Sequence, residues 1–386
     1  MKIVIAIDKF KGSATSQQLA DAIEAVLREE IDQIDVVKVP VADGGDGTMR
    51  AIKAIMKDNC RVVTLNVPAC LACLPPLEVQ YLLDREGTTA FMDLATASGL
   101  ALVPLSCRDV TQSSTYGTGM MMAHAIQQGA TSIVLGLGGS ATCDGGAGLL
   151  AALGCEFFDS SHRSFIPCGS TLADIAEIGL ENLKKTVEDV SFTALTDVDN
   201  PLLGPNGAAA VFAPQKGASP QQVEELEKGL SNFARFLPSG IPAKPGSGAA
   251  GGVGGSMAGL LSANIMPGIG YLLELSHFEE LIADSQLIIT GEGRIDQQTA
   301  MGKAPSGVLN VARRHNIPVV ALCGSVSHQA DVSRMGFAQV IEVTPKDMPL
   351  QQAMETSTTL SCVRKAIKGL CSEIKTNANG SCGTAI

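Results

Sequence analysis

The chain has little aromatic character and few histidines. Its 386 residues include no Trp, three Tyr, eleven Phe and five His. The core must therefore be built from aliphatic side chains, and it can be, because hydrophobic residues make up 45% of the sequence. With 17% charged residues, this composition is typical of a globular protein, and the length suffices for two domains.

Basic residues are scarce relative to acidic ones. Lys and Arg total 28 against 39 Asp and Glu, which gives a formal net charge of −11 at pH 7. Binding nucleic acid through its phosphates requires a basic surface, so this balance argues against a nucleic-acid partner. It does not exclude a small anionic ligand, because local amide dipoles and a few cations decide such binding.

The sequence lacks the marks of a secreted or membrane protein. Met1–Asp8 has the pattern of a short strand ended by an acid, not of a secretory signal. The eleven cysteines contain one C-x-x-C pair, Cys70 and Cys73, which disfavours a zinc site and predicts reduced thiols. Residues 245–273 carry no charge, but their Gly, Ser and Pro content leaves too little apolar density for a membrane span. We therefore expect a cytoplasmic protein without a membrane partner.

The common nucleotide-binding and hydrolase motifs are missing as well. There is no G-x-x-x-x-G-K-[ST] segment, no kinase Asp-Phe-Gly and no G-x-S-x-G. The G-x-G-x-x-G match at Gly246–Gly251 follows Pro242 and Pro245 where a strand should be, so it fails as a dinucleotide motif. None of the His residues stands in a nucleophile pattern.

One glycine-rich segment, Gly136–Gly148, is the most informative part of the chain. It follows an apolar strand-like run, Ser132–Leu135, and precedes a helix-like run, Leu149–Leu153. Six of its thirteen residues are Gly, which lets backbone amides crowd around a ligand because no Cβ blocks close approach. Consecutive amides at a helix start favour an anion, most often phosphate. Asp144 lies inside the segment, where a carboxylate can hold a metal ion or take a proton.

Three further glycine-rich segments favour a phosphate-handling site over a plain turn. Ala42–Thr48 contains two aspartates, and Gly291–Asp296 follows the strand-like run Gln286–Thr290. Pro245–Ser256 adds six more Gly. One such loop could be a turn without a ligand, but three acid-bearing ones are harder to explain that way.

Alternating strand-like and helix-like runs predict an α/β protein. Helical spacing occurs at Ser16–Glu29, Pro220–Phe236, Ser306–His315 and Leu350–Lys368. Ten apolar runs are expected as strands: Lys2–Ile7, Val36–Val39, Val62–Val67, Glu78–Leu83, Ala90–Leu94, Ser132–Leu135, Ser191–Leu195, Gln286–Thr290, Pro318–Cys323 and Val340–Val343.

The two chain ends are expected to build one domain. Residues 1–60 and 275–386 both carry short buried strands and crossover helices, which predicts a Rossmann-like parallel sheet assembled from both ends. Residues 61–274 would form a second, inserted α/β domain, with boundaries open by ten residues or more. Ligands bind at the carboxyl edge of such sheets, and the segments after Ile7 and Thr290 would meet at that edge.

Lysines and acids gather beside the glycines at the predicted strand ends. Lys11 follows the first strand, Lys216 precedes a Gly, and Asp197 follows the strand-like run that ends near Thr196. Phosphoryl transfer needs this combination: cations and amides that neutralise the moving charge, a few acids for a metal ion, and a base near the acceptor hydroxyl. Taken singly, each residue would be expected as a solvated surface charge, and the clustering favours a site.

Six segments, in order along the chain, resemble the bacterial glycerate kinases of the first type (glycerate 2-kinases). They are Asp8–Ser13, Pro40–Thr48, Gly138–Gly148, Asp197–Leu202, Phe212–Ala218 and Thr290–Asp296. The resemblance implies a flavodoxin-like domain interrupted by a second α/β domain. It also implies an alcohol phosphotransferase that uses ATP and Mg²⁺ to convert glycerate to 2-phosphoglycerate, with ADP as the other product. The corresponding metabolic setting is glycerate/glyoxylate or sugar-acid catabolism.

The resemblance and the motifs together suggest roles for individual residues. Asp197 is the first candidate for the base and Asp296 the second. Lys11 and Lys216 would neutralise phosphate or carboxylate oxygens, and the planar guanidinium of Arg294 would clamp the carboxylate of glycerate. The other expected contacts to substrate or phosphate, with Asp144 also expected near Mg²⁺, are Asp8, Ser13, Asp43, Gly44, Gly45, Gly138, Gly139, Ser140, Asp144, Gly145 and Glu292.

Several alternatives stay open at the level of sequence. The chain could phosphorylate another small hydroxy acid, such as tartronate, or could be a sensor that binds a phosphorylated metabolite without turnover. Cys143 stands where the family often carries Asn, which predicts sensitivity to thiol reagents. The position phosphorylated and the oligomeric state, including a homo-oligomer, are also open.

Overall fold

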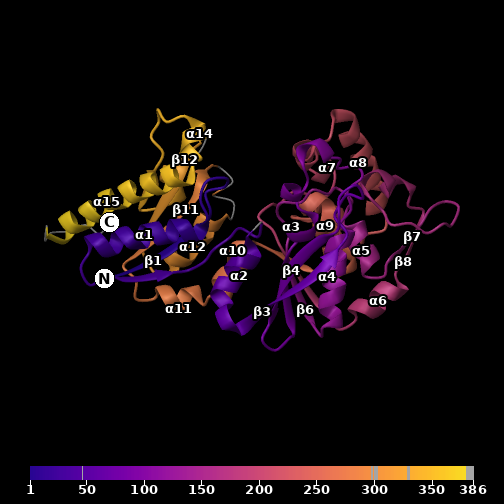
Figure 1. Ribbon diagram of the computed structural model, residues 1–386, viewed down its shortest axis with the longest axis horizontal. Coiled ribbons are helices and arrows are strands. Elements are labelled where there is room, and N and C mark those ends of the chain that lie inside the picture. The colour runs from indigo at the N-terminus through magenta and orange to yellow at the C-terminus, as the bar shows by residue number, and fades with distance from the viewer. Residues whose placement is uncertain (46, 297–298, 300–302, 328–330, 380–386) are drawn as a thin grey trace. The chain divides into compact units, whose positions relative to one another are not determined.

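The computed structural model describes residues 1–45, 47–296, 299, 303–327 and 331–379 (Figure 1). The contacts divide the chain into two compact units. Unit 1 comprises Met1–Asp43 and Ile269–Ile386, and unit 2 comprises Gly44–Gly268. The chain thus changes unit at residues 43/44 and 268/269, whereas the sequence alone suggested 60/61 and 274/275.

Unit 1 is built on a five-stranded parallel sheet in the order β13-β12-β11-β1-β2. Its strands are β1 (Lys2–Ile7), β2 (Asp35–Lys38), β11 (Leu287–Ile295), β12 (Val319–Val326) and β13 (Gln339–Glu342). Counted within the unit, this is the flavodoxin-like order 2-1-3-4-5. The expected flavodoxin/Rossmann-like domain made from both chain ends is confirmed.

Helices cover both faces of this sheet, which explains why its strands are continuous apolar runs. Ile5 and Ile289 pack on α1 (Ser16–Glu30) and α15 (Thr356–Asn379), which lie side by side in Figure 1. The alternate side chains Val4 and Ile288 pack on α10 (Gly268–Leu275), α11 (Phe278–Ile282) and α12 (Ala304–Arg314). Two four-residue helices, α13 (Val332–Met335) and α14 (Leu350–Ala353), complete the described helices of the unit.

Helix α1 shows how local sequence fixes an element boundary. The hydroxyl of Thr15 accepts a hydrogen bond from the amide of Gln18, and the side-chain oxygen of Gln18 accepts one from the amide of Thr15, which together form a capping box. Apolar residues then recur at helical spacing and are buried against the sheet.

Unit 2 contains a mixed six-stranded sheet in the order β10-β9-β6-β5-β4-β3. Strands β3, β4 and β5 are antiparallel, while β5, β6, β9 and β10 are parallel. The bounds are β3 (Cys60–Val67), β4 (Leu77–Asp84), β5 (Thr89–Asp93), β6 (Ser132–Gly136), β9 (Ser191–Leu195) and β10 (Asn264–Met266), with a separate hairpin of β7 (Glu156–Phe158) and β8 (Glu177–Gly179). The sequence analysis missed the three-residue strands β7, β8 and β10, which are too short to show a period.

The helices of unit 2 and its sheet share a core of aliphatic residues with a few aromatic rings. The largest buried side chains of this core are those of Phe157, Phe233 and Tyr81. The helices are α2 (Thr48–Met56), α3 (Ala95–Ser98), α4 (Tyr116–Gln127), α5 (Ala147–Ala152), α6 (Glu181–Val187), α7 (Ala208–Phe212), α8 (Pro220–Ala234) and α9 (Ala249–Leu260).

The segment Gly291–Asp296, expected as a loop, is mostly strand. Strand β11 continues to Ile295, and Arg294 pairs with Ser325 of β12. Gly291 is required there because a Cβ would collide with the carbonyl group of Leu322. The glycine therefore marks a close approach of two strands, not a turn.

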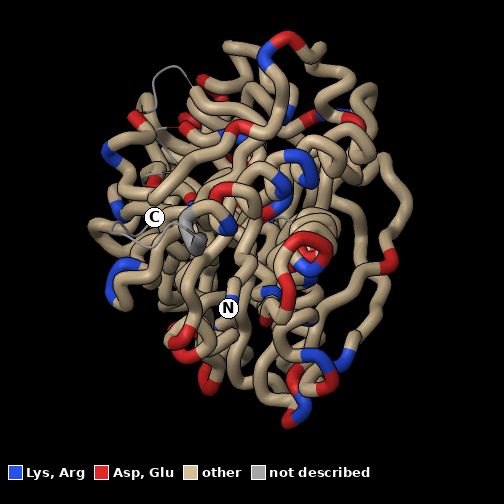
Figure 2. Tube along the Cα trace, turned by 90° about the vertical axis from the view of Figure 1, so that its left-hand side faces the viewer, with Lys and Arg blue, Asp and Glu red and all other residues tan. Residues whose placement is uncertain are grey.

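Charged residues of both signs are interspersed along the chain trace (Figure 2). None of the helices in the described ranges combines the length and apolar character that crossing a membrane requires.

Candidate active site

The glycine-rich loop of unit 2 leaves the carboxyl end of β6 and runs to α5. Its first half is held by backbone hydrogen bonds: the amide of Leu100 donates to Gly139 O, and the amide of Ala141 donates to Ser98 O, each at 2.8 Å. Gly139 has a φ of 74° and is exposed. Within the described ranges, the amides of Gly138, Gly139 and Ser140 have no hydrogen-bond acceptor in the protein. They are therefore available to an anion.

The second half of the loop is organised by Asp144, which is completely buried. One carboxylate oxygen accepts from the amide and hydroxyl of Thr115, both at 2.7 Å, and from the amide of Gly148 at 3.2 Å. The other oxygen accepts from the amide of Gly146 at 3.2 Å. Burial raises the pKa of Asp144, and these hydrogen bonds oppose that shift.

This arrangement corrects the expectation that an external anion binds at the start of α5. The amides of Gly146 and Gly148 are occupied by the protein's own carboxylate. The hydroxyl of Thr115 also accepts from the amide of Leu149, so α4 and α5 are tied together at their beginnings. Asp144 is a positioning residue in this structure, and the open amides lie earlier in the loop.

A lysine is buried beside those open amides. Lys216 ends the short 3₁₀ helix Pro214–Lys216 and is 3% exposed. Its ammonium donates to the hydroxyl of Ser140 and the carbonyl oxygen of Thr142, both at 2.7 Å. In the described part of the chain no carboxylate lies within 4.0 Å of it, and burial lowers its pKa to about 8. Lys216 and Ser140, two of the candidates that the sequence suggested, are thus in direct contact; their role in binding stays a prediction.

The segment Pro245–Ser256, expected as a second glycine-rich loop, forms the start of α9. Ala250, Gly251 and Gly252 adopt left-handed conformations and kink the helix. The carbonyl of Gly251 accepts from the amide of Gly145, and the hydroxyl of Ser256 donates to Gly145 O. These glycines let α9 pack directly on the loop that carries Asp144. Their role in the structure is support for that loop.

Cys143 lies in the same loop but is completely buried. Burial raises its pKa to about 12, although the nearby charge of Lys216 opposes the shift. A thiol without thiolate character or access is inert. The expected sensitivity to thiol reagents is therefore wrong for Cys143.

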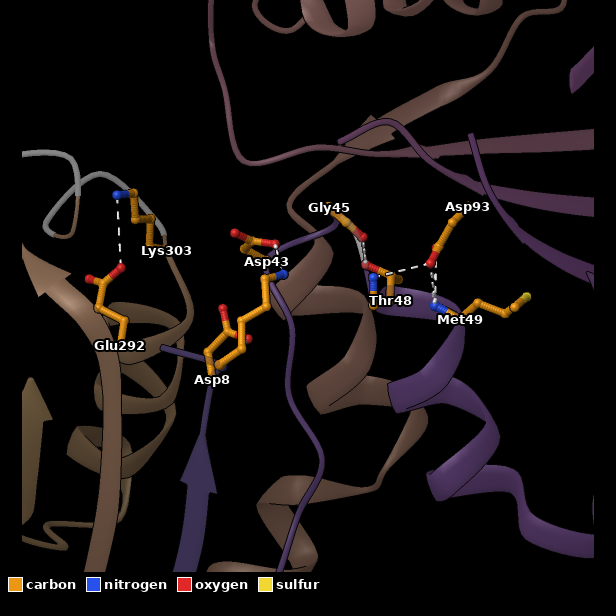
Figure 3. A network of polar contacts seen from close by, with 10 residues as sticks. Asp8, Asp43, Gly45, Thr48, Met49, Asp93, Glu292 and Lys303 are labelled. Atoms are coloured by element: carbon orange, nitrogen blue, oxygen red, sulfur yellow. Dashed lines mark hydrogen bonds and ion pairs between the residues drawn. The ribbon is translucent and has the colours of Figure 1, made fainter. Parts of the chain in front are cut away.

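The turn before α2 is fixed by Asp93, at the carboxyl end of β5. Its carboxylate accepts from the amides of Gly47 at 3.2 Å and Met49 at 3.0 Å, and so caps the helix (Figure 3). The carbonyl of Gly45 accepts from the amide and hydroxyl of Thr48. Gly44 has a φ of 97°, and a Cβ there would lie 3.1 Å from the backbone of Leu195.

Asp197 lies just beyond the carboxyl end of β9, the strand next to β6. Its side chain is exposed. Asp197 follows a strand, as the sequence suggested, and the structure shows that this strand is paired with the one that carries the glycine-rich loop. Its role as base stays a prediction.

Unit 1 gathers a second set of predicted residues at the carboxyl edge of its own sheet. Asp8 follows β1, and its amide donates to Gly291 O at 3.0 Å, so Asp8 lies next to Glu292 of the adjacent parallel strand β11. The two residues are 6% and 9% exposed. Burial raises the pKa of each to about 7; for Asp8 the charge of Asp43 adds to the effect.

Lysines neutralise part of this acidic cluster. Lys9 lies 3.9 Å from Asp43, and Lys303 lies 3.8 Å from Glu292 and 3.6 Å from Asp296. The pair of Glu292 and Lys303 is drawn in Figure 3. Asp296 and Glu292 therefore share one cation, the ammonium of Lys303.

The remaining candidates of unit 1 differ in their surroundings. Lys11 is exposed and precedes Gly12, whose φ is 80°. Ser13 accepts a hydrogen bond at its carbonyl from the hydroxyl of Thr356, at the start of α15. Arg294 is exposed on the extended end of β11. Its role as a carboxylate clamp stays a prediction.

The described residues do not form a protein cage for a metal ion. No group of three or more His, Cys, Asp or Glu side chains among them is arranged to hold one. Asp144, expected near Mg²⁺, has its oxygens taken by four donors. Mg²⁺ commonly uses one or two carboxylates together with substrate phosphates, so a preformed cage is not required.

Several residues of these sites were not among the sequence candidates, among them Asp93, Thr115 and Lys303. Asp93 had a detectable signal, because a carboxylate ended a predicted strand. Thr115 had none, since its partner Asp144 is 29 residues away in the sequence. Lys303 stood next to a Gly but outside any recognised motif.

Known proteins resemble this chain over nearly its whole length. The sequence profile described as the Glycerate kinase family matches residues 3–373. A glycerate kinase from Bacillus subtilis (strain 168) is 39% identical over 360 residues, which cover 92% of this chain and 93% of the relative. A glycerate 2-kinase from Escherichia coli (strain K12) is 39% identical over 86% of this chain and 87% of its own length. A crystal structure from Salmonella typhimurium LT2, assigned as a glycerate kinase 2, superposes with a TM-score of 0.82 at 36% identity and covers 98% of this chain and 99% of that one.

Replacing Gly251 by Ala should destabilise unit 2 strongly. The new Cβ would lie inside van der Waals contact of the Thr142 carbonyl oxygen and 2.7 Å from Cys143 Cα. We expect a loss of about 3 kcal/mol or more in the free energy of unfolding, measured by denaturant titration. Gly240→Ala is the matched control: its φ is also positive, at 92°, but nothing lies within 4 Å of the added Cβ. That variant should lose only about 1–2 kcal/mol, and equal losses in the two variants would contradict the packing argument.

Cys143 should resist alkylation in the folded protein. Iodoacetamide followed by peptide mass mapping should modify the exposed Cys73 and leave Cys143 unmodified until denaturant is added. Labelling of Cys143 at the rate of Cys73 under native conditions would show that the loop opens.

Proposed function

Because the chain belongs to the glycerate kinase family, we propose that it transfers the γ-phosphoryl group of ATP to the C2 hydroxyl of glycerate. The products would be 2-phosphoglycerate and ADP. Family membership makes the protein a phosphotransferase with an alcohol acceptor, which decides against a sensor without turnover. Position 2 is supported by the name of the Escherichia coli relative, a glycerate 2-kinase. Catabolism of glycerate, glyoxylate or sugar acids would be the metabolic setting.

The observation that carries this proposal is the buried ammonium of Lys216. A buried cation without a carboxylate partner is unfavourable unless an anion joins it. Its neighbours, the open amides of Gly138 and Gly139, supply further donors of the kind that cradle phosphate. We therefore assign the phosphate groups of ATP to this part of unit 2. Mg²⁺ would enter as part of the Mg-ATP substrate.

In the reaction, cations and amides would neutralise the charge that spreads over the transferring phosphoryl oxygens. Lys216 would do this from a fixed position, because two hydrogen bonds hold its ammonium. Asp144 would keep the loop in shape without touching the substrate. Lys11 and Arg294 are proposed to bind anionic groups from unit 1, the guanidinium of Arg294 taking the carboxylate of glycerate.

Another small hydroxy acid is the alternative acceptor. Tartronate shares the α-hydroxy carboxylate group of glycerate but has a second carboxylate in place of the hydroxymethyl group. The acidic cluster of Asp8, Asp43 and Glu292 would repel that additional charge, which favours glycerate.

Proton-coupled ³¹P NMR of the product tests both substrate and position. A phosphate on C2 of glycerate couples to one proton and gives a doublet, whereas one on C3 couples to two and gives a triplet. We expect the doublet with glycerate and Mg-ATP, together with stoichiometric ADP. A triplet would show phosphorylation at position 3, and turnover with tartronate but not with glycerate would assign a different acceptor.

Lys216→Met should abolish activity without loss of the fold. Methionine keeps the length of the side chain and removes a buried charge that opposes folding, which offsets the loss of the hydrogen bonds to Ser140 and Thr142, so the unfolding temperature without ligand should fall by only a few degrees. The stabilisation by Mg-ATP should vanish, and kcat/KM should drop by about 100-fold or more. Lys228→Met, on the exposed face of α8, should retain both properties. A Lys216→Met enzyme that Mg-ATP still stabilises would remove the phosphate site from this loop.

A further inference from the structure

The carboxyl edge of the unit 1 sheet contains a carboxylate that differs from its neighbours. Asp8 follows β1 between the ends of β2 and β11. One of its oxygens accepts from the amide of Lys9 at 2.7 Å, which fixes the orientation of the carboxylate. The other oxygen has no hydrogen-bond partner in the parts of the chain that the structure describes. In Figure 3 the side chain of Asp8 points from the strand end toward Asp43.

The other carboxylates of this cluster each have a hydrogen-bond or ion-pair partner. Glu292 accepts from the hydroxyl of Thr299 at 2.6 Å and faces Lys303. Asp43 faces Lys9. Asp296 faces Lys303 and accepts from the amide of Thr299 at 3.2 Å. In this cluster Asp8 therefore combines deep burial with an unpartnered oxygen.

We propose that Asp8 is the catalytic base that removes the proton from the acceptor hydroxyl, in place of Asp197. The inference rests on the proposed function and names the residue that carries its proton transfer. Glu292 and Asp43 are positioning residues in this scheme. Their negative charges raise the pKa of Asp8 and so make its carboxylate a stronger base. Asp197, in contrast, is exposed.

The step balances with the proposed substrates. The open oxygen of Asp8 takes the hydroxyl proton, and the acceptor oxygen forms a bond to the γ-phosphorus of ATP. The bond between that phosphorus and the β–γ bridging oxygen breaks, and its electron pair leaves with ADP. Asp8 returns its proton to solvent after the phosphorylated product departs.

The surroundings of Asp8 predict a pH dependence with a definite sign. Burial and the charges of Asp43 and Glu292 raise its pKa, the charge of Lys9 lowers it, and the result is about 7. A base works only when deprotonated, and this pKa is that of the free enzyme, so kcat/KM for glycerate should fall as the pH drops below about 7. For stability the sign is opposite: a raised carboxyl pKa favours the folded state at low pH, and this contribution is lost as pH rises through 7.

The test measures kcat, and the pH profile of kcat/KM for glycerate at saturating Mg-ATP, in the full-length enzyme for wild type, Asp8→Asn and Asp197→Asn. Asp8→Asn should lower kcat by about 10²–10⁴-fold and remove the decline below pH 7. Mg-ATP should still raise its unfolding temperature, and the variant should be at least as stable as wild type at pH 8. Asp197→Asn should keep the decline. Asp35→Asn, the same substitution at the exposed amino end of β2, is the matched control and should behave as wild type.

Two results would overturn the inference. One is an Asp8→Asn enzyme that keeps more than about a tenth of kcat or retains the decline below pH 7. The other is loss of the decline in Asp197→Asn alone. If wild type forms no phosphoglycerate, the proposed function fails and this inference with it. If wild type forms it and Asp8→Asn matches wild type, only the role of Asp8 fails.

Discussion

The buried carboxylate of Asp144 is the interaction on which the architecture of unit 2 depends. A carboxylate removed from water is strongly unfavourable unless donors surround it. Thr115 and the amides of Gly146 and Gly148 provide those donors, and in doing so they fix the beginnings of α4 and α5 relative to each other. The glycines of α9 then pack on the same loop because no side chain intervenes. The first half of the loop is held in place by this support while its own amides stay open.

Among the described residues, the two units differ in which buried charge lacks a partner of opposite charge near their strand ends. In unit 2 four donors surround the buried carboxylate of Asp144, whereas the buried ammonium of Lys216, next to amide donors, has the surroundings that suit an anion. In unit 1 the buried charges are the carboxylates of Asp8 and Glu292, which create a site that prefers a neutral or proton-donating group. A phosphoryl donor and a hydroxyl acceptor require these two environments.

The fold was largely predictable because both sheets depend on short apolar runs that the sequence displays. All ten expected strands occur, with ends that shift by a few residues; β11 is the exception and extends to Ile295. Gly291 suggested a turn, and only the position of Leu322 on the adjacent strand shows that the glycine permits close approach instead. Residues 44–60 belong to unit 2 because α2 is capped by Asp93 of that unit's sheet, a contact between residues far apart in the sequence.

The sequence by itself determined the family, the α/β class, the origin of one domain from both chain ends and the identity of most charged residues near the strand ends. Local patterns suffice for these because strand and helix periods, glycine content and motif order are properties of neighbouring residues. Only the tertiary structure shows what surrounds each charge. Four donors of the protein surround the carboxylate of Asp144, whereas Asp8 is buried near the carboxylates of Asp43 and Glu292. Burial and long-range partners set the protonation and availability of a side chain, and both arise only when distant segments pack together.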